Sequence, residues 1–504
     1  MIWLDIQLLT PNMITPSRTR FLHQARPEPL VLSIPAPTED PYELYCRLSV
    51  PGYSSFLLES GKGKDTVARY SFMGCGPYLM LSGKEESYEL RTRDGVTVHQ
   101  GSPWNALRDR LRASPISNPG GLPPFFGGAV VFLSYDLVRQ FEQLPRLALD
   151  DLYLPDLECL FVDQVAALDH HTQTLHLMFT PPLQRFQEEP REKLYREGCD
   201  RLAEWEARLA IPSRQDDLSS IGRLDIQPGQ SQDSYMERVR QCQEFIRAGD
   251  IYQANLSHRF AVQWHESQRS SDRQAASALY RRLKAVNPSP FSALLHLDRF
   301  SLVGCSPERL IRLTGRSADT RPIAGTRRRG TTAVDDRRLA EELLSNTKER
   351  AEHLMLVDLE RNDLGRVCRY GSVRTNELMA IERYSHVSHI VSNVSGELRD
   401  GVDGLDLIEA VFPGGTITGV PKIRCMEIIE ELEPVRRGPY TGSLGYMSWS
   451  GDLDLNIIIR TLVMTDSCSY LQVGAGIVAD SDPFKEYEET LLKAQAVMKA
   501  LGVS

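Results

Sequence analysis

The chain switches often between strand-like and helix-like residue patterns, and this mixture restricts its fold more than any single motif does. Between residues 42 and 178, short runs rich in β-branched and aromatic residues, such as SSFLLES and AVVFLSYDL, are separated by Gly, Pro and Asp. Further along, helical and strand-like segments are mixed without the strict alternation that a parallel sheet requires. The sequence therefore predicts an α+β fold with layered β-sheets flanked by helices, rather than a doubly wound sheet.

Changes in composition divide the chain into four stretches. Residues 1–40 contain several prolines and no clear period, which indicates a loosely ordered lead-in. Residues 41–210 are expected to form a β-rich region, and the polar segment 211–232 is the best candidate for a linker. Residues 233–504 form the second main region, where most of the chemically suggestive loops occur.

Periodicity and capping residues give approximate limits for the regular elements. Helices are expected at 183–209, 233–250, 274–286, 335–364, 404–411, 421–432 and 484–500. Later strands are expected at 291–304, 308–314, 441–449, 453–463 and 469–478.

Charge and composition exclude several classes of function. The chain has 58 Lys and Arg against 67 Asp and Glu, so its net charge of −9 argues against general binding to nucleic acid or an anionic membrane. No apolar run approaches the roughly 18–20 residues that a membrane-spanning helix needs, and the first residues do not resemble a signal peptide. The nine cysteines are dispersed and lack CxxC spacing. These features favour reduced thiols and a cytoplasmic location.

Two pairs of glutamates have a spacing that suggests metal binding. Glu349 and Glu352 lie three residues apart in one predicted helix, and Glu486 and Glu489 have the same spacing in another. Residues at i and i+3 share a helix face, so the pairs could direct four carboxylates at one point. Mg²⁺ is the hard cation that such a cluster would hold. Taken alone, either pair also fits a solvated helix face.

A glycine-rich segment, Phe412–Lys422, joins two predicted helices. Its glycines would let backbone N–H groups approach a ligand, and Thr416 and Thr418 add hydroxyl groups. Because helix N-termini attract anions, a ligand carboxylate fits this segment. A plain helix end followed by a turn is the alternative.

A second group of candidates follows predicted strands near the C-terminus. Gly474, Ala475 and Gly476 could place bare backbone beside a small ligand, or form a tight turn. Arg460 ends an apolar strand, where its guanidinium could clamp a carboxylate or form a structural ion pair. Tyr440 could donate to the same anion, although a lone tyrosine is also a common packed residue.

Two further residues suggest proton transfer. Glu308 follows Ser306 and Pro307, which together form a possible helix start, but the alternating residues after it indicate a strand entrance facing a cleft. A carboxylic acid there could protonate a departing hydroxyl if burial raised its pKa. His389 lies in an extended β-rich segment, where a buried structural histidine and a catalytic one are both possible.

Several of these segments together strongly resemble the chorismate-utilising enzymes, a family that includes anthranilate, aminodeoxychorismate, isochorismate and salicylate synthases. The resemblance is dense over about 235–500 and weaker in FLLESG (56–61) and GGAVVFLSYDL (127–137). Its main motifs are PIAGTRRRG (322–330), EHLMLVDLERNDLGR (352–366), HIVS (389–392), FPGGTITGVPKIRCMEIIEELEP (412–434), GSLGYMSWSGDLDLNIIIRTL (442–462) and GAGIVADSDPFKEYEE (474–489). It implies the fold of anthranilate synthase component I.

The resemblance also implies a role for each candidate. Glu349, Glu352, Glu486 and Glu489 would surround Mg²⁺, which holds the ring carboxylate of chorismate. The enolpyruvyl carboxylate would be received by Tyr440, Arg460 and the backbone of Gly474, Ala475 and Gly476. Glu308 would be the general acid for the C4 hydroxyl, and His389 would act on the C2 side. The remaining residues implied to lie at the substrate are Thr416, Lys422, Ala324, Gly325 and Thr326.

Short differences between family members favour one activity. Tyr252–Ser257 (YQANLS), Gly414–Thr416 and Pro290–Ala293 resemble aminodeoxychorismate synthases more than anthranilate synthases. Ala324 points the other way, because some aminodeoxychorismate synthases carry a lysine there that is proposed to attack C2. Without that amine, water or ammonia must reach C2. A possible tryptophan pocket, which echoes anthranilate synthases, comprises Glu59, Ser60, Asn287, Pro288, Ser289 and Pro290.

The expected reaction is the conversion of chorismate and ammonia to 4-amino-4-deoxychorismate, for 4-aminobenzoate and folate. The chain lacks a G-x-C-x-G nucleophile elbow, so the resemblance implies a separate glutamine amidotransferase subunit as the source of ammonia. Three alternatives are an anthranilate synthase, a water-using isochorismate or salicylate synthase, and a non-catalytic regulator that binds tryptophan or chorismate. Gln253 does not suit the lysine-base role that the water-using enzymes require.

Overall fold

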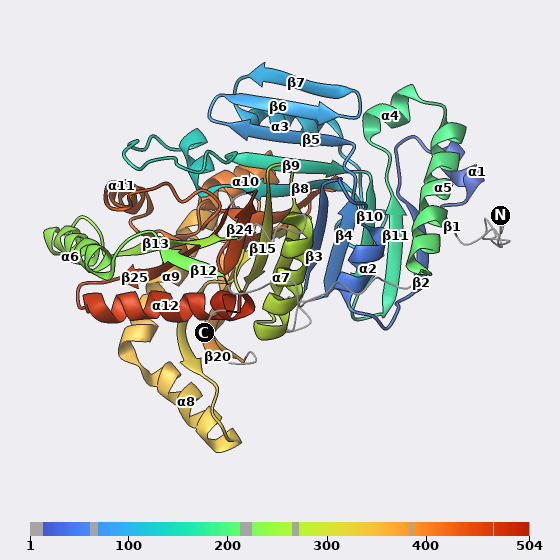
Figure 1. Ribbon diagram of the computed structural model, residues 1–504. Coiled ribbons are helices and arrows are strands. Elements are labelled where there is room, and N and C mark those ends of the chain that lie inside the picture. The colour runs from blue at the N-terminus through green and yellow to red at the C-terminus, as the bar shows by residue number, and fades with distance from the viewer. Residues whose placement is uncertain are drawn as a thin grey trace.

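The computed structural model describes residues 14–60, 69–211, 224–264, 272–383, 387–466 and 468–502. Its body consists of two antiparallel β-sheets with helices on their outer faces, which confirms the predicted α+β class (Figure 1). No helix in these ranges is long and apolar enough to cross a bilayer.

The first sheet, here sheet 1, has 13 strands that come from both halves of the sequence. Their spatial order is β1 (Ile14–Thr15), β2 (Leu30–Pro35), β11 (Thr174–Phe179), β10 (Gln164–Asp169), β4 (Tyr70–Cys75), β3 (Ser55–Glu59), β14 (Phe291–His296), β15 (Phe300–Ser306), β24 (Thr461–Thr465), β25 (Cys468–Ile477), β13 (Gln253–Gln263) and β12 (Asp225–Pro228), with β21 (Gly419–Val420) also paired to β13.

The second sheet, sheet 2, has 12 strands and is also shared by both halves. Their order is β18 (Ile323–Arg328), β20 (Val387–Glu397), β17 (Ser317–Thr320), β16 (Arg309–Thr314), β23 (Leu453–Ile457), β22 (Ser443–Ser448), β8 (Gly128–Leu133), β9 (Leu157–Val162), β5 (Leu79–Lys84), β6 (Ser87–Thr92) and β7 (Gly95–Gln100), with β19 (Arg374–Arg383) also paired to β20.

The two sheets pack face to face over one apolar core. Phe132 of β8 meets Phe300 of β15 with ring centroids 5.3 Å apart, and Phe72 of β4 meets Tyr446 of β22 at 5.1 Å. Such edge-to-face contacts between aromatic rings add to the gain from burial. Because the two sheets pack against each other, the segments that cross from one sheet to the other have defined positions.

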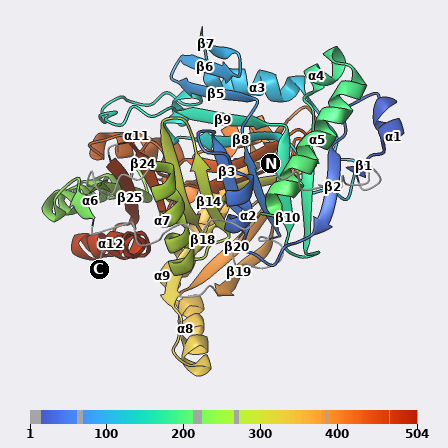
Figure 2. The same ribbon diagram turned by 45° about the vertical axis from the view of Figure 1, so that its right-hand side comes forward.

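Helices cover the outer face of sheet 1 or flank sheet 2 (Figures 1 and 2). They are α1 (Arg18–Leu22), α2 (Pro41–Leu48), α3 (Pro103–Ala113), α4 (Leu183–Glu188), α5 (Arg191–Leu209), α6 (Gln232–Ala248), α7 (Asp272–Val286), α8 (Ala333–Ser345), α9 (Thr347–Gly365), α10 (Gly404–Val411), α11 (Lys422–Leu432) and α12 (Pro483–Ala500), with 3₁₀ turns η2 (Tyr135–Gln140) and η5 (Gly415–Ile417). In both views α8 projects from the body.

Four predicted elements are divided in the structure. The expected helix 183–209 is two helices, α4 and α5, with Pro190 at the start of the second. Asn346 ends α8 and caps α9, where its side chain accepts from the amides of Lys348 and Glu349, so the expected helix 335–364 is two helices. A turn at 297–299 splits the expected strand 291–304 into the hairpin β14–β15. Arg460, with φ of +51°, separates β23 from β24 within 453–463.

The first region is more ordered than the lead-in prediction implies. From Ile14 onward it supplies β1, α1 and β2, because β2 pairs with β11 along its whole length and buries Leu30 and Leu32. The predicted linker lies partly outside the described residues, at 212–223. Both sheets draw strands from each side of it, so 211–232 separates two stretches of sequence and not two sheets.

Candidate active site

Two neighbouring strand crossings between the sheets bring Glu308 and Arg460 together. The chain leaves β15 of sheet 1 at Ser306 and enters β16 of sheet 2 at Arg309, so Glu308 lies in the crossing. Arg460 lies in the reverse crossing, between β23 and β24. Because β15 pairs with β24 and β16 with β23, the crossings are adjacent. Backbone bonds from Cys305 N to the Arg460 carbonyl (3.3 Å) and from Ile457 N to the Glu308 carbonyl (3.0 Å) hold them there.

Glu308 is in the environment that a general acid requires. Its side chain is buried, and this burial raises the pKa of its carboxyl to about 7. The Thr416 hydroxyl, the Ile323 amide and the charges of Arg460 and Lys493 act in the opposite direction. The Thr416 hydroxyl is near enough to lower the pKa of Glu308, although among the described residues it has no hydrogen-bond partner at normal geometry. The strand-entrance interpretation of this segment is therefore the one that the structure adopts.

His389 lies on β20, opposite Thr326 of the neighbouring strand β18. Its Nδ1 is 2.9 Å from the Thr326 hydroxyl oxygen. Burial, and then the positive charge of Arg460, lower the pKa of the imidazole to about 4, while a bond to the Gly325 backbone acts against them. The imidazole is therefore neutral at pH 7 and within the electrostatic reach of Arg460.

A bulge in β18 brings its backbone close to the first glutamate pair. Gly325 has φ of +73° at a register shift opposite β20, a conformation that favours glycine. A Cβ on this glycine would lie 2.8 Å from Glu349 Oε2. Ala324, just before the bulge, is buried opposite Ile390. The stretch 324–326 therefore lies between His389 and Glu349.

Two glycines of β25 form a surface without side chains. A Cβ on Gly474 would lie 2.5 Å from Asn255 Oδ1 and 2.8 Å from the Tyr440 hydroxyl, and one on Gly476 would lie 2.6 Å from Gln253 Nε2. Lys493 of α12 donates to the Gly474 carbonyl over 2.9 Å. Ala475 points to the opposite face, into the core beneath α6 and α11, so only its backbone is available on the site side.

The four glutamates lie on two helices, α9 and α12, as their spacing predicts. Arg327 donates to Glu349 over 2.9 Å, Gln253 donates to Glu352 over 3.1 Å, and Lys493 pairs with Glu489 at 2.9 Å.

Electrostatic effects show that the two glutamate pairs approach each other. Burial raises the pKa of Glu352, and the charges of Glu349 and Glu489 raise it further. Burial also raises the pKa of Glu486, to which Glu489 adds. Carboxylates from α9 and α12 thus share one electrostatic environment.

These oxygen donors are of the kind that Mg²⁺ prefers, and the mutual repulsion of the carboxylates would be relieved by a cation. In the described part of the chain, however, no three acidic, histidine or cysteine side chains are close enough to form a ready-made metal cluster. Two of the four glutamates, Glu349 and Glu489, are instead paired with Arg327 and Lys493. The donor set therefore fits Mg²⁺ by chemistry and position, with side chains that must move to coordinate it.

The segment 412–422 joins α10 to α11, as predicted, and folds around η5. Thr418 donates to the Gly414 carbonyl over 2.9 Å, which closes the turn that presents Thr416 to Glu308. The ammonium group of Lys422 binds Asp363 and the Val411 carbonyl. Its contacts are therefore structural.

The segments of the possible tryptophan pocket also meet. Glu59 of β3 is opposite Ser292 of β14, next to residues 287–290. Its carboxylate accepts from the Tyr280 hydroxyl over 2.8 Å and pairs with Lys284 at 2.5 Å. The Ser60 amide donates to the Ser71 hydroxyl over 3.3 Å. The sequence likeness thus corresponds to one location in space.

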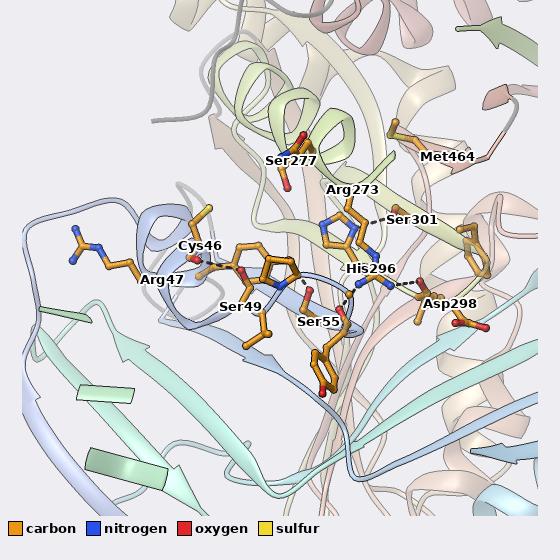
Figure 3. A pocket seen from close by; sticks show the side chains of 18 of the residues that line it. Cys46, Arg47, Ser49, Ser55, Arg273, Ser277, His296, Asp298, Ser301 and Met464 are labelled. Carbon is orange, nitrogen blue, oxygen red and sulfur yellow. Dashed lines mark hydrogen bonds between the residues drawn. The ribbon is translucent and has the colours of Figure 1, made fainter. Parts of the chain in front are cut away.

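A pocket of about 780 Å³ lies at the other end of the β3–β14 pair, where Ser55 is opposite His296 (Figure 3). Arg273 spans it, with bonds to the carbonyls of Tyr53 and Leu297. The side chains of His296 and Ser301 bond to each other over 2.8 Å. None of the predicted site residues lines this pocket.

Sequence reasoning missed three residues that the structure places at the site. The amide oxygens of Gln253 and Asn255 are buried without a hydrogen-bond partner among the described residues. Both lie on β13 and face the glycines of β25. Lys493 is four residues after Glu489, so helical spacing could have identified it. Gln253 and Asn255 lie in the motif YQANLS, but the motif gives them no position, because only strand pairing brings them to the site.

Comparison with known proteins gives the family. The model of the chorismate binding enzyme family matches residues 53–499, and the chain belongs to this family. It is 45% identical over 449 residues to aminodeoxychorismate synthase component 1 of Bacillus subtilis, a match that covers 89% of this chain and 92% of that protein. It is 44% identical over 469 residues to anthranilate synthase component 1 of Thermus thermophilus, a match that covers 93% of this chain and 96% of that protein.

A crystal structure of anthranilate synthase component I from Streptococcus pneumoniae TIGR4 superposes with a TM-score of 0.73 at 32% identity. The match covers 85% of this chain and 92% of that one. This agreement confirms the predicted chorismate-binding fold and the predicted family. Relatives with two different activities are similar to the chain at nearly the same identity. The comparisons therefore establish the family but do not decide between the two products.

Proposed function

We propose that the chain is an aminodeoxychorismate synthase component I, which converts chorismate and ammonia to 4-amino-4-deoxychorismate for 4-aminobenzoate and folate. The observation that carries this proposal is the buried carboxyl of Glu308, whose pKa is raised to about 7 beside the cationic groups Arg460 and Lys493. An acid that keeps a substantial protonated fraction near neutral pH, next to groups that attract anions, suits a small dianion with a departing hydroxyl.

The binding groups match the two carboxylates of chorismate. Arg460, Tyr440 and the bare backbone at Gly474 and Gly476 receive the enolpyruvyl carboxylate, where a guanidinium and N–H donors give strong charge-assisted bonds. Glu349, Glu352, Glu486 and Glu489 would hold Mg²⁺ against the ring carboxylate, which would withdraw charge from the ring.

Glu308 and His389 act on different sides of the chorismate ring, Glu308 at C4 and His389 near C2. A nucleophile, water or ammonia, forms a bond to C2 as both conjugated double bonds of the ring shift and the C4–O bond breaks. Glu308 gives its proton to the leaving oxygen, which departs as water. Neutral His389 is in the correct protonation state to accept a proton on the C2 side. Ammonia then bonds to C4 as the C2 nucleophile leaves, so one ammonia is consumed and one water released overall.

The choice of product rests on short motifs and on one relative. The YQANLS segment and Gly414–Thr416 favour aminodeoxychorismate, and the Bacillus subtilis protein supports this choice. A second candidate is anthranilate synthase component I, which would keep the amine at C2 and eliminate pyruvate. The Thermus thermophilus protein and the Streptococcus pneumoniae structure favour it, as does Ala324, which excludes a covalent lysine intermediate at this position.

Ammonia would come from a separate glutamine amidotransferase subunit, because the sequence has no nucleophile elbow. A cytoplasmic location fits the nine free cysteines, since a reducing compartment keeps thiols unpaired.

The test is product identification by liquid chromatography and mass spectrometry. Pure protein is incubated with chorismate and Mg²⁺, with and without an ammonium salt. The proposal predicts ammonia-dependent 4-amino-4-deoxychorismate. A fluorescent anthranilate product would favour the second candidate, and isochorismate or salicylate formed without ammonia would contradict both.

A further inference from the structure

A buried ion pair lies behind the groups that line the candidate site. Arg437, in the segment that follows α11, is 2% exposed, and Glu433, the residue that ends α11, is 4% exposed. Nε and Nη2 of Arg437 donate to the two carboxylate oxygens of Glu433 over 3.0 and 2.7 Å. Because burial removes both charges from water, such a pair often adds little stability by itself. Its further contacts indicate a different role.

The remaining N–H groups of Arg437 reach three other points of the chain. Nη2 donates to the Asn255 carbonyl over 2.6 Å, and Nη1 donates to the Ile417 carbonyl over 2.9 Å and the Thr441 hydroxyl over 3.3 Å. All five N–H groups of the guanidinium are thus used within the protein. A lysine ammonium group, with three donors and no planar fork, could not make this set of bonds.

Each of these partners is next to, or part of, a group of the candidate site. Ile417 directly follows Thr416 in η5, and Thr441 directly follows Tyr440. Asn255 carries one of the amide oxygens that face β25 without a hydrogen-bond partner among the described residues. One guanidinium therefore joins three separate segments that carry site groups.

The ring of Tyr440 is held on its face as well as through its backbone. The guanidinium carbon of Arg437 lies 5.6 Å from the centroid of this ring and 4.9 Å from that of Tyr135, at distances where a cation attracts an aromatic face. The Tyr440 amide donates to the Arg437 carbonyl over 3.2 Å. Thr441 then has φ of +61°, which is rare for a β-branched residue and turns the chain sharply after the tyrosine.

Glu433 extends the same network to the glycine strand β25. Its Oε1 accepts from the amide and from the hydroxyl of Ser257 on β13, both over 2.8 Å. The Ser257 hydroxyl oxygen accepts in turn from Gln472 Nε2 over 2.8 Å. Gln472 lies on β25, two residues before Gly474. The strands β13 and β25, the turn η5 and the Tyr440 segment thus meet at one ion pair.

We propose that Arg437, paired with Glu433, is a positioning residue that holds Tyr440, the η5 turn and the two strands in one arrangement around the ligand. Its N–H groups are all used within the protein, so Arg437 acts on the ligand through these groups and not by contact. This role rests on the proposed function for one point, the identity of the ligand as chorismate, which both product candidates share. Without the fork, the binding groups would be less preorganised, and chorismate would have to order them on binding.

The first test is the affinity for chorismate, measured by calorimetry in the presence of Mg²⁺. Arg437→Lys keeps a positive charge beside Glu433 but cannot bond to the Asn255 and Ile417 carbonyls at the same time. The Kd for chorismate should rise at least about tenfold, because small displacements of positioning groups have large effects. An unchanged Kd would overturn the proposal.

Arg201→Lys is the matched control. Arg201 also pairs with a buried carboxylate, Asp163, at 2.9 Å and lies over an aromatic ring, that of Phe179, but none of these residues is at the site. Its Kd for chorismate should equal that of the wild type, and thermal unfolding compares the stability of the two variants. If Arg437→Lys does not fold, Arg437→Met combined with Glu433→Gln takes its place, since this pair of changes leaves no buried charge unpaired.

A double-mutant cycle with Tyr440→Phe separates positioning from a merely structural role. If Arg437 acts through the Tyr440 hydroxyl, the increase in Kd caused by Arg437→Lys should be at least about threefold smaller in the Tyr440→Phe background. Equal fold-changes in the two backgrounds would overturn the proposal.

The last test needs no ligand. In protein labelled with 3-fluorotyrosine, the fluorine NMR signal that is lost in Tyr440→Phe belongs to Tyr440. Arg437→Lys should broaden or split this signal, and Arg201→Lys should leave it unchanged. A signal of unchanged line width in Arg437→Lys would overturn the positioning role. A wild-type protein that does not bind chorismate would contradict the proposed function, while the line width of Tyr440 would still decide whether Arg437 positions this residue.

Discussion

The backbone amide of Ile457 donates to the carbonyl oxygen of Glu308 over 3.0 Å, and this bond ties the acid to the strand that leads into Arg460. The two crossings between the sheets therefore form one rigid unit. The paired strands that flank both crossings hold Glu308 and Arg460 near each other.

The pKa of Glu308 predicts the alkaline limb of activity. The proton must be present for the C4 hydroxyl to leave, and burial raises the pKa of the carboxyl to about 7. Turnover should therefore be highest below this pH and fall as the pH rises through about 7 and above. The measurement is kcat against pH at saturating chorismate. A kcat that continues to rise to pH 9 would contradict the acid role.

The burial of Glu308 also predicts that the folded state becomes less stable as the pH rises. A carboxyl whose pKa is higher in the folded state favours folding at low pH, and this contribution is lost as the pH rises through the folded-state pKa. Glu308→Gln removes the cost of burying the charge. The melting temperature of the variant relative to wild type should thus increase by a few degrees between about pH 5 and pH 8. A constant difference across this range would show that Glu308 is not ionised within it.

Gly474 is predicted to tolerate no side chain. A Cβ there would lie 2.5 Å from Asn255 Oδ1 and 2.7 Å from the Leu256 carbonyl, so Gly474→Ala must displace the strand or the amide. We expect a loss of at least tenfold in kcat/KM and a cost of about 1–3 kcal/mol in stability. Gly365→Ala is the control, because Gly365 lies at the end of α9 with no atom in the way. Equal behaviour of the two variants would refute the close approach.

The carboxylates of α9 and α12 are predicted to set the Mg²⁺ requirement. Glu352→Gln and Glu486→Gln should each raise the Mg²⁺ concentration for half-maximal turnover by at least about tenfold, because each removes a charged oxygen donor. Glu488→Gln is the control, since this residue is an exposed neighbour on the same helix. A chorismate-dependent shift of melting temperature with Mg²⁺ provides a second readout. Unchanged Mg²⁺ dependence in both site variants would show that Mg²⁺ does not bind at this position.

Periodicity and turn residues predicted most elements of the second region, including α10 with its observed limits. The failures have specific causes. Asn346 is compatible with a helix in the sequence, and only its capping geometry divides α8 from α9. A non-glycine residue with positive φ, such as Arg460, cannot be recognised from an apolar strand pattern, because the crossing to the other sheet imposes it.

The site was predictable where spacing along a helix defines it and where the family resemblance supplies motifs, as for the glutamate pairs and Glu308. Residues brought in by strand pairing were not. Gln253 reaches Glu352 because β13 pairs with β25 along a long register. Lys422, although it lies in a recognisable motif, is taken up by Asp363, a contact between elements that no local pattern encodes.

The most direct test of the account is a comparison of wild type with Glu308→Gln under single-turnover conditions with chorismate, Mg²⁺ and an ammonium salt. Removal of the proton donor should lower the rate of aminated product formation by about 10²–10⁴-fold, while calorimetry should show chorismate binding within about threefold of wild type, because Arg460, Tyr440 and the glycine backbone are intact. A variant that forms product at the wild-type rate would contradict the central claim that Glu308 is the acid.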